Sequence, residues 1–100
     1  MSEREADGPT PIAEDSRPRF PHGVRLTYNE AQGGWVLLAP ERVFKADAIA
    51  AEILKRCTGE ATLKAIVDDL VANFAASRER ILADVTSILR SLADKRLLEL

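Results

Sequence analysis

Residue types that often carry out catalysis are scarce in this chain of 100 residues. His22 is the single histidine and Cys57 the single cysteine, so neither has a second residue of its kind with which to bind a metal. No base or basic residue stands at an obvious spacing from Cys57 apart from the neighbouring Arg56. Asp68 and Asp69 form an acidic pair, but adjacent helical residues do not face each other. We therefore predict a solvated histidine, a buried apolar cysteine and a polar helix surface.

Two further patterns could mark a ligand-binding site, a glycine pair and two aromatic residues on strands, and neither is a strong signal. Gly33 and Gly34 lack the remaining glycines and the strand-to-helix context of a phosphate-binding loop. Trp35 and Phe44 could contact a ligand, although aromatic residues on strands belong to the core more often. With no catalytic constellation visible, we predict that the protein is not an enzyme and binds no cofactor or metal.

Composition and charge narrow the class of protein. Sixteen acidic and 14 basic residues give a net charge of -2, which disfavours a general nucleic-acid binder. A single cysteine excludes an internal disulfide and fits the reducing cytoplasm, where we expect the protein. No apolar run is long enough for a membrane span or a signal peptide, so we expect no membrane association.

The chain divides into a tail and one domain. Residues 1–17 combine proline, glycine and charged side chains with few aliphatic ones, too few to offset the entropy lost on ordering. We expect a disordered tail over residues 1–17 and a single domain over residues 18–100. Within the domain, residues 24–29 alternate apolar and polar side chains as a strand does, and residues 35–39 and 42–45 predict two more strands.

Three helices are predicted after the strands. Asp47, Thr62 and Ser77 are residue types that cap helix N-termini. The sequence therefore predicts an α+β fold, a small antiparallel sheet of about three strands followed by a winged-helix-like bundle of three helices. The apolar positions at helical spacing are Ile49, Ile53, Leu54 and Cys57 in the first helix, which Gly59 ends, then Leu63, Ile66, Val67, Leu70, Val71 and Phe74, then Ile81, Val85, Ile88 and Leu92, with Leu82 and Leu89 widening that last face.

The segments "RPRF", "GVRLTYNEAQGGWVLLAPERVF", "AAEIL" and "LADKRLLEL" together resemble the PqqD family of pyrroloquinoline quinone (PQQ) biosynthesis. The resemblance covers nearly everything from Arg17 to Leu100. It implies a chaperone, not an enzyme, that binds the precursor peptide PqqA and presents it to the radical S-adenosylmethionine enzyme PqqE. Related domains serve as leader-peptide recognition elements. Arg96 departs from the family pattern, because glycine commonly stands there and suits a left-handed helix end.

A binding mode follows from the predicted edge strand. The strand at residues 42–45 offers unpaired backbone groups to which an extended peptide can add as a further strand. The third helix would supply a groove for alternate side chains, by a flank that the sequence does not define. The predicted peptide-binding residues are Arg42, Val43, Phe44, Lys45, Leu82, Val85, Thr86 and Leu89.

Two other functions stay open at the level of sequence. The helix order also fits a winged-helix DNA-binding regulator, although the third helix balances Arg78, Arg80 and Arg90 with acidic residues. An enzyme would need catalytic residues that the sequence does not display. An exposed strand edge invites dimerisation as well as peptide binding, so we expect a monomer or a homodimer.

Overall fold

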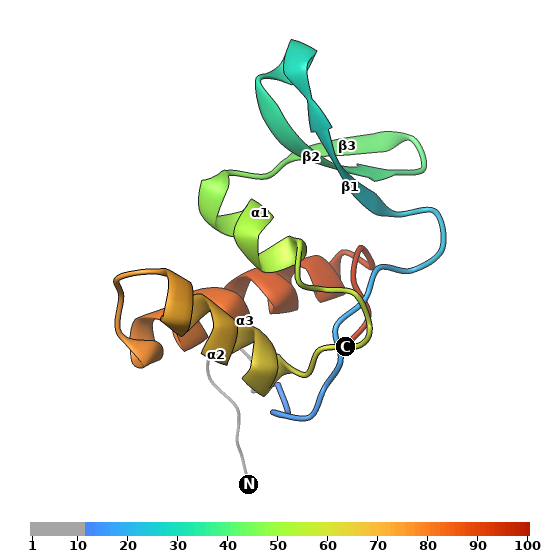
Figure 1. Ribbon diagram of the computed structural model, residues 1–100. Coiled ribbons are helices and arrows are strands. Elements are labelled where there is room, and N and C mark those ends of the chain that lie inside the picture. The colour runs from blue at the N-terminus through green and yellow to red at the C-terminus, as the bar shows by residue number, and fades with distance from the viewer. Residues whose placement is uncertain (1–11) are drawn as a thin grey trace, which may run out of the picture.

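The computed structural model describes residues 12–100, with a small sheet at one end of the molecule and helices at the other (Figure 1). One short helix, α1, lies between the sheet and the remaining two helices. This arrangement is the predicted α+β fold, and the fold class is confirmed. The elements are β1 (Arg25–Asn29), η2 (Glu30–Gln32), β2 (Gly34–Ala39), β3 (Arg42–Lys45), α1 (Ala48–Leu54), α2 (Leu63–Asn73) and α3 (Arg78–Asp94).

The three strands form an antiparallel sheet in the order β1-β2-β3. Tyr28 pairs with Trp35 across β1 and β2, and Leu37 pairs with Phe44 across β2 and β3. The turn between β1 and β2 contains η2, which Gly33 ends in the left-handed region at φ 81°. Because β2 is the central strand, β1 and β3 are both edge strands of this sheet.

The three predicted helix caps are confirmed. The side chains of Asp47, Thr62 and Ser77 each accept a hydrogen bond from the backbone N–H three residues further along. Each cap satisfies one of the four N–H groups that a helix start leaves unpaired. The first helix is shorter than predicted, because α1 ends at Leu54 and not at Gly59.

The core joins all three helices, but the predicted apolar faces are not buried along their full length. Ile49 is 59% exposed and Phe74 is 45% exposed. Phe74 leaves the helical path, with φ -131° and ψ 145° as the C-cap of α2, so its side chain departs from the apolar stripe. In the same stripe, Leu63, Ile66, Val67 and Leu70 are buried as predicted. The core residues of the helices and C-terminus are Ile53, Leu54, Cys57, Leu63, Ile66, Val67, Leu70, Ile81, Val85, Leu89 and Leu98.

Residues 12–17, the described part of the predicted tail, contact the start of α2. The backbone N–H of Leu63 donates to the carbonyl oxygen of Ser16 at 2.8 Å, and that of Lys64 donates to Glu14 at 3.1 Å. These bonds satisfy two further N–H groups of the helix start, which explains why a polar segment lies here. Residues 14–16 therefore contact the domain that the sequence analysis begins at residue 18. Residues 1–11 lie outside the described part of the chain.

The chain after the tail is held by the C-terminus. The backbone groups of Arg19 and Glu99 exchange two hydrogen bonds, of 2.9 and 2.8 Å, and Arg19 Nε donates to Glu99 Oε1 at 2.8 Å. Leu97 and Leu98 fold back into the interior, whereas Leu100 is 40% exposed. Segments nearly at opposite ends of the sequence therefore close the domain together.

Candidate functional site

Within residues 12–100, the backbone of β3 presents a free edge. The N–H of Ala46 donates to the carbonyl oxygen of Trp35 at 3.0 Å, so the residues of β3 with the same parity, such as Phe44, point their backbone groups towards β2. The intervening residues Val43 and Lys45 must then point theirs away from β2. Since β2 is the one neighbour of β3 in this sheet, these groups can pair with an added strand.

Side chains alternate between the two faces of β3. Phe44 lies opposite the buried Leu37 and is half-buried, and the Arg42 guanidinium carbon lies 5.3 Å from the centre of its ring. Val43, on the other face, is 54% exposed, and Lys45 is exposed as well. The strand edge therefore combines free backbone groups with apolar and cationic side chains that solvent reaches.

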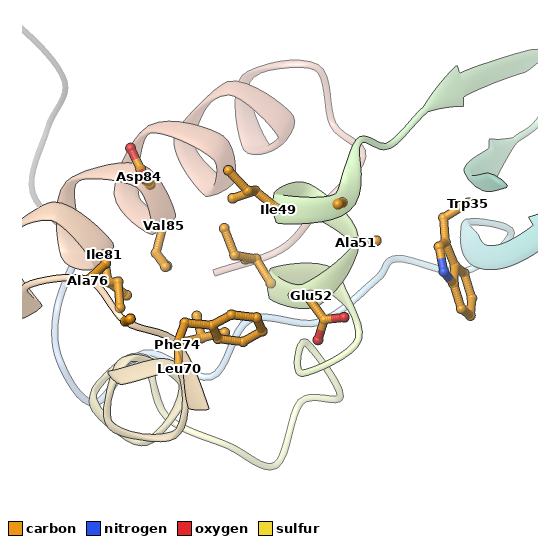
Figure 2. Close-up of a pocket in the computed structure, with 13 residues that line it drawn as sticks. Trp35, Ile49, Ala51, Glu52, Leu70, Phe74, Ala76, Ile81, Asp84 and Val85 are labelled. Carbon is orange, nitrogen blue, oxygen red and sulfur yellow. The ribbon is translucent and has the colours of Figure 1, made fainter. Parts of the chain in front are cut away.

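An apolar groove of about 500 Å³ opens among the three helices. Figure 2 shows Phe74, at the end of α2, and Ile49, in the first turn of α1, on either side of it. Their exposure, unexpected for core residues, arises because they line this opening. The lining residues, which we call the apolar groove, are Trp35, Ala48, Ile49, Ala51, Glu52, Ile53, Leu70, Phe74, Ala75, Ala76, Ile81, Asp84 and Val85.

Two charged side chains line the apolar groove, Glu52 and Asp84. Both are acidic, and each lies beside a cationic side chain. Glu52 accepts from Lys55 Nζ at 3.0 Å and from Arg56 Nη1 at 3.1 Å, and these two cations hold the pKa of its carboxyl below the usual value. Asp84 lies 3.5 Å from Arg80 Nε. The groove is consequently apolar in its interior, with neutralised polar groups at its margin.

The structure brings together part of the predicted site. Val85 of α3 lines the apolar groove, and no lining residue comes from β3. Leu82, 39% exposed, and Thr86 lie roughly 100° and 140° around the helix axis from Ile81, outside the groove. Leu89 has no exposed surface. The flank of α3 that faces the apolar groove carries Ile81 and Asp84.

Sequence reasoning missed Ile49, Phe74 and Ile81 as groove residues and assigned them to the core. Ile49 and Ile81 stand in the first turns of α1 and α3, and Phe74 is the C-cap of α2, so each lies at an end of its helix. Periodicity shows which side of a helix is apolar, but it does not show where a neighbouring helix stops covering that side.

The residues considered for catalysis are not assembled. Cys57 is buried, and burial raises the pKa of its thiol to about 12. Asp68 pairs with Lys64 and Arg78, which lower its pKa, and Asp69 pairs with Arg56. Within residues 12–100 no histidine, cysteine and carboxylate side chains gather into a group able to hold a metal.

None of the helices in this part of the chain is long and apolar enough to cross a membrane.

The third helix has little charge to offer a DNA backbone. Arg78 pairs with Asp68, and Arg80 lies within 3.5 Å of Asp84. Phosphate recognition depends on positive charge that is not already neutralised, so these pairs remove much of the attraction. The geometry of α3 does not favour the DNA-binding alternative.

The fold and the site define a winged-helix-like binding domain, with an open strand edge beside an apolar groove. Residues 34–98 match the PqqD family, described as Coenzyme PQQ synthesis protein D. The chain belongs to this family. The resemblance stated from the sequence is therefore confirmed.

Relatives and solved structures agree with this assignment. A PqqA binding protein of Bradyrhizobium diazoefficiens is 48% identical over 84% of this chain and 82% of its own length, and one of Xanthomonas axonopodis pv. citri is 45% identical over 89% and 97%. The solution structure of the PqqD truncation of Methylobacterium extorquens PqqCD, a functional stand-alone RiPP (ribosomally synthesised, post-translationally modified peptide) recognition element, matches with a TM-score of 0.77 and 40% identity, covering 92% of this chain and 98% of the other. The crystal structure of PqqD from Xanthomonas campestris matches with a TM-score of 0.56 and 42% identity, covering 90% and 100%.

Proposed function

We propose that this protein binds the precursor peptide PqqA as a recognition element of PQQ biosynthesis and that it is not itself an enzyme. Relatives at 48% and 45% identity carry the name PqqA binding protein, and the chain covers most of their length. The M. extorquens structure of the same fold is described as a functional recognition element. The observation in this chain that carries the proposal is the free edge of β3.

The proposed binding mode is strand addition at β3. Val43 and Lys45 would supply backbone donors and acceptors, which give affinity for any extended chain. Lys45 would attract an acidic peptide residue, and Arg42 and Phe44 would contact peptide side chains on the other face. These roles remain predictions for all four residues.

The apolar groove would supply selectivity. Ile49 follows Lys45 by four residues, so the two are at most about 14 Å apart along the chain. A peptide that extends past this end of β3 therefore reaches the groove within a few residues. There Ile49, Phe74 and Val85 would receive apolar peptide side chains, while Leu82, Thr86 and Leu89 keep their predicted roles only if the helices rearrange on binding.

In this scheme the protein presents PqqA to the radical S-adenosylmethionine enzyme PqqE in the cytoplasm. An added strand leaves the rest of the peptide outside the domain, where a second protein can act on it. Support for PqqE as the second protein comes from the family resemblance. The test is the yield of cross-linked PqqA formed by PqqE with and without this protein, which should rise when it is present.

An NMR titration of the ¹⁵N-labelled protein with PqqA tests the binding site. We expect the largest amide shifts at Val43, Lys45, Ile49 and Phe74, which belong to β3 and the apolar groove. A PqqA peptide of scrambled sequence should bind more weakly, because it can still pair with the backbone of β3 but loses its side-chain contacts in the apolar groove. Shifts confined to β1 or to the C-terminal half of α3 would contradict the proposed site.

A further inference from the structure

A second hollow, of about 560 Å³, lies between the sheet and the C-terminal end of α1. It shares Trp35 with the apolar groove and no other lining residue. Its charged lining residues are all cationic, whereas those of the apolar groove are both acidic. We call it the basic groove, and its lining residues are Arg19, Phe20, Arg25, Leu26, Trp35, Leu54, Lys55, Cys57 and Thr58.

The cations of the basic groove come from three separate segments. Arg19 precedes the sheet, Arg25 begins β1, and Lys55 caps the C-terminal end of α1. Arg19 pairs with Glu99 at 2.8 Å and Lys55 pairs with Glu52 at 3.0 Å. Within residues 12–100 no ion pair engages the exposed Arg25. The groove thus keeps one uncompensated positive charge at its rim.

Apolar surface lies beside this charge. Leu26 and Trp35 come from the face of the sheet that is turned towards the helices, and Leu54 comes from α1. The Lys55 ammonium lies 4.8 Å from the centre of the Trp35 ring, so the aromatic ring also carries a cation at its face. Cations around an apolar floor match a ligand that has carboxylates on either side of an apolar side chain.

We propose that the basic groove is a second docking site, and that its occupant is an acidic segment of a partner protein. One carboxylate pairs with Arg25, another reaches Arg19 or Lys55, and an apolar side chain between them packs on Leu26 and Trp35. A nucleic acid fits less well, because three cations, two of them paired, neutralise few phosphates on a chain of net charge -2. The proposal goes beyond peptide recognition at β3, since the site lies apart from that edge. Both sites can then be filled at once, which lets one domain hold a peptide and a second protein.

The test uses the full-length protein, ¹⁵N-labelled, and two synthetic probe peptides. The first has the sequence Glu-Leu-Glu-Phe-Glu with blocked termini, and the second has lysine in place of each glutamate. We expect the glutamate peptide to shift the amides of Arg25, Leu26 and Thr58 in a saturable, salt-dependent manner, and the lysine peptide to leave them in place. Arg25→Gln should lower the affinity for the glutamate peptide by about fivefold, which is the effect expected from the loss of one exposed ion pair.

The matched control is Arg80→Gln, which removes an exposed arginine of α3 outside the basic groove and should leave the affinity unchanged. Arg25 is exposed and unpaired within the described residues, so its replacement leaves the fold intact, and circular dichroism checks this. Charge reversal by Arg25→Glu should lower the affinity for the glutamate peptide further. The proposal is overturned by equal binding of the two peptides, by equal affinity of Arg25→Gln and the parent, by shifts at Ile49 and Phe74 instead, or by an oligonucleotide that binds there more tightly than the peptide.

Discussion

At the scale of single residues, Arg96 occupies a position that favours glycine. Its φ is 62°, and the N–H groups of Arg96 and Leu97 donate to the carbonyls of Ala93 and Leu92 in the Schellman pattern that ends α3. Arg96 departs here from the glycine of the family pattern. The left-handed end is retained here despite a cost of roughly 1 kcal/mol for a side chain in this region.

Replacing Arg96 with glycine should therefore stabilise the protein. We expect Arg96→Gly to raise the free energy of unfolding by roughly 0.5–1 kcal/mol in urea denaturation, because glycine adopts this φ without strain. The control Arg96→Ala removes the same side chain but keeps the Cβ, and it should give no comparable gain. Equal stability of the two variants would show that the left-handed geometry carries no cost here.

Cys57 offers a second prediction at this scale. Its thiol is buried, with a pKa raised to about 12, and should react with a thiol reagent only when the protein unfolds. The folded-state pKa exceeds the usual 9.0, so the neutral thiol contributes its full stability below pH 9 and loses it progressively between pH 9 and 12. Cys57→Ala should lack this part of the alkaline loss. Rapid labelling of the native protein at neutral pH would contradict the burial.

At the scale of elements, α2 carries both a core stripe and one wall of the apolar groove. Ile66 is fully buried and lies outside the groove, whereas Phe74 is 45% exposed and lines it. Ile66→Ala should cost about 2–5 kcal/mol of unfolding free energy with little effect on the peptide affinity per folded molecule. Phe74→Ala should do the reverse, costing about 1 kcal/mol or less in stability while weakening PqqA binding. Thermal denaturation measures the change in stability, and calorimetry measures the change in PqqA affinity. A large loss of stability in Phe74→Ala would show that Phe74 belongs to the core.

The elements themselves were largely predictable. Alternation identified the first strand, and side-chain chemistry identified the caps Asp47, Thr62 and Ser77, because both are local properties of the chain. The groove was not predictable, since it depends on how far α2 and α1 extend past each other. The flank of α3 that faces it also follows from helix packing rather than from the apolar pattern of α3 alone.

At the scale of the whole molecule, the described part of the predicted tail accepts hydrogen bonds from the start of α2. Deleting residues 1–11 should leave the melting temperature unchanged, given their low apolar content. Deleting residues 1–17 removes the carbonyls of Glu14 and Ser16 that accept from Lys64 and Leu63, and should lower stability by about 1–3 kcal/mol. Composition alone predicts no difference between the two deletions, because it does not register backbone hydrogen bonds. Equal melting temperatures would show that the contacts of residues 12–17 do not stabilise the domain.

In the described part of the chain the sheet has two open edges, at which another copy of the chain could add. Both β1 and β3 could pair with a second copy of the chain, so the choice between monomer and homodimer remains a prediction for light scattering to decide. Peptide addition at β3 and dimerisation through β3 would compete. A dimer that dissociates on addition of PqqA would identify β3 as the shared edge.

The central claim, strand addition at β3, is tested most directly by a proline on each edge. Val43 and Tyr28 are similarly exposed, at 54% and 56%, and their backbone N–H groups both point away from β2 by the alternation of the ladder. Val43→Pro and Tyr28→Pro should both stay folded by circular dichroism, because neither removes a hydrogen bond to β2. Calorimetry with PqqA should show at least about tenfold weaker binding for Val43→Pro, equivalent to roughly 1.4 kcal/mol, and parental affinity for Tyr28→Pro. Parental affinity in a folded Val43→Pro variant would contradict the claim, because the peptide would then bind without the edge of β3.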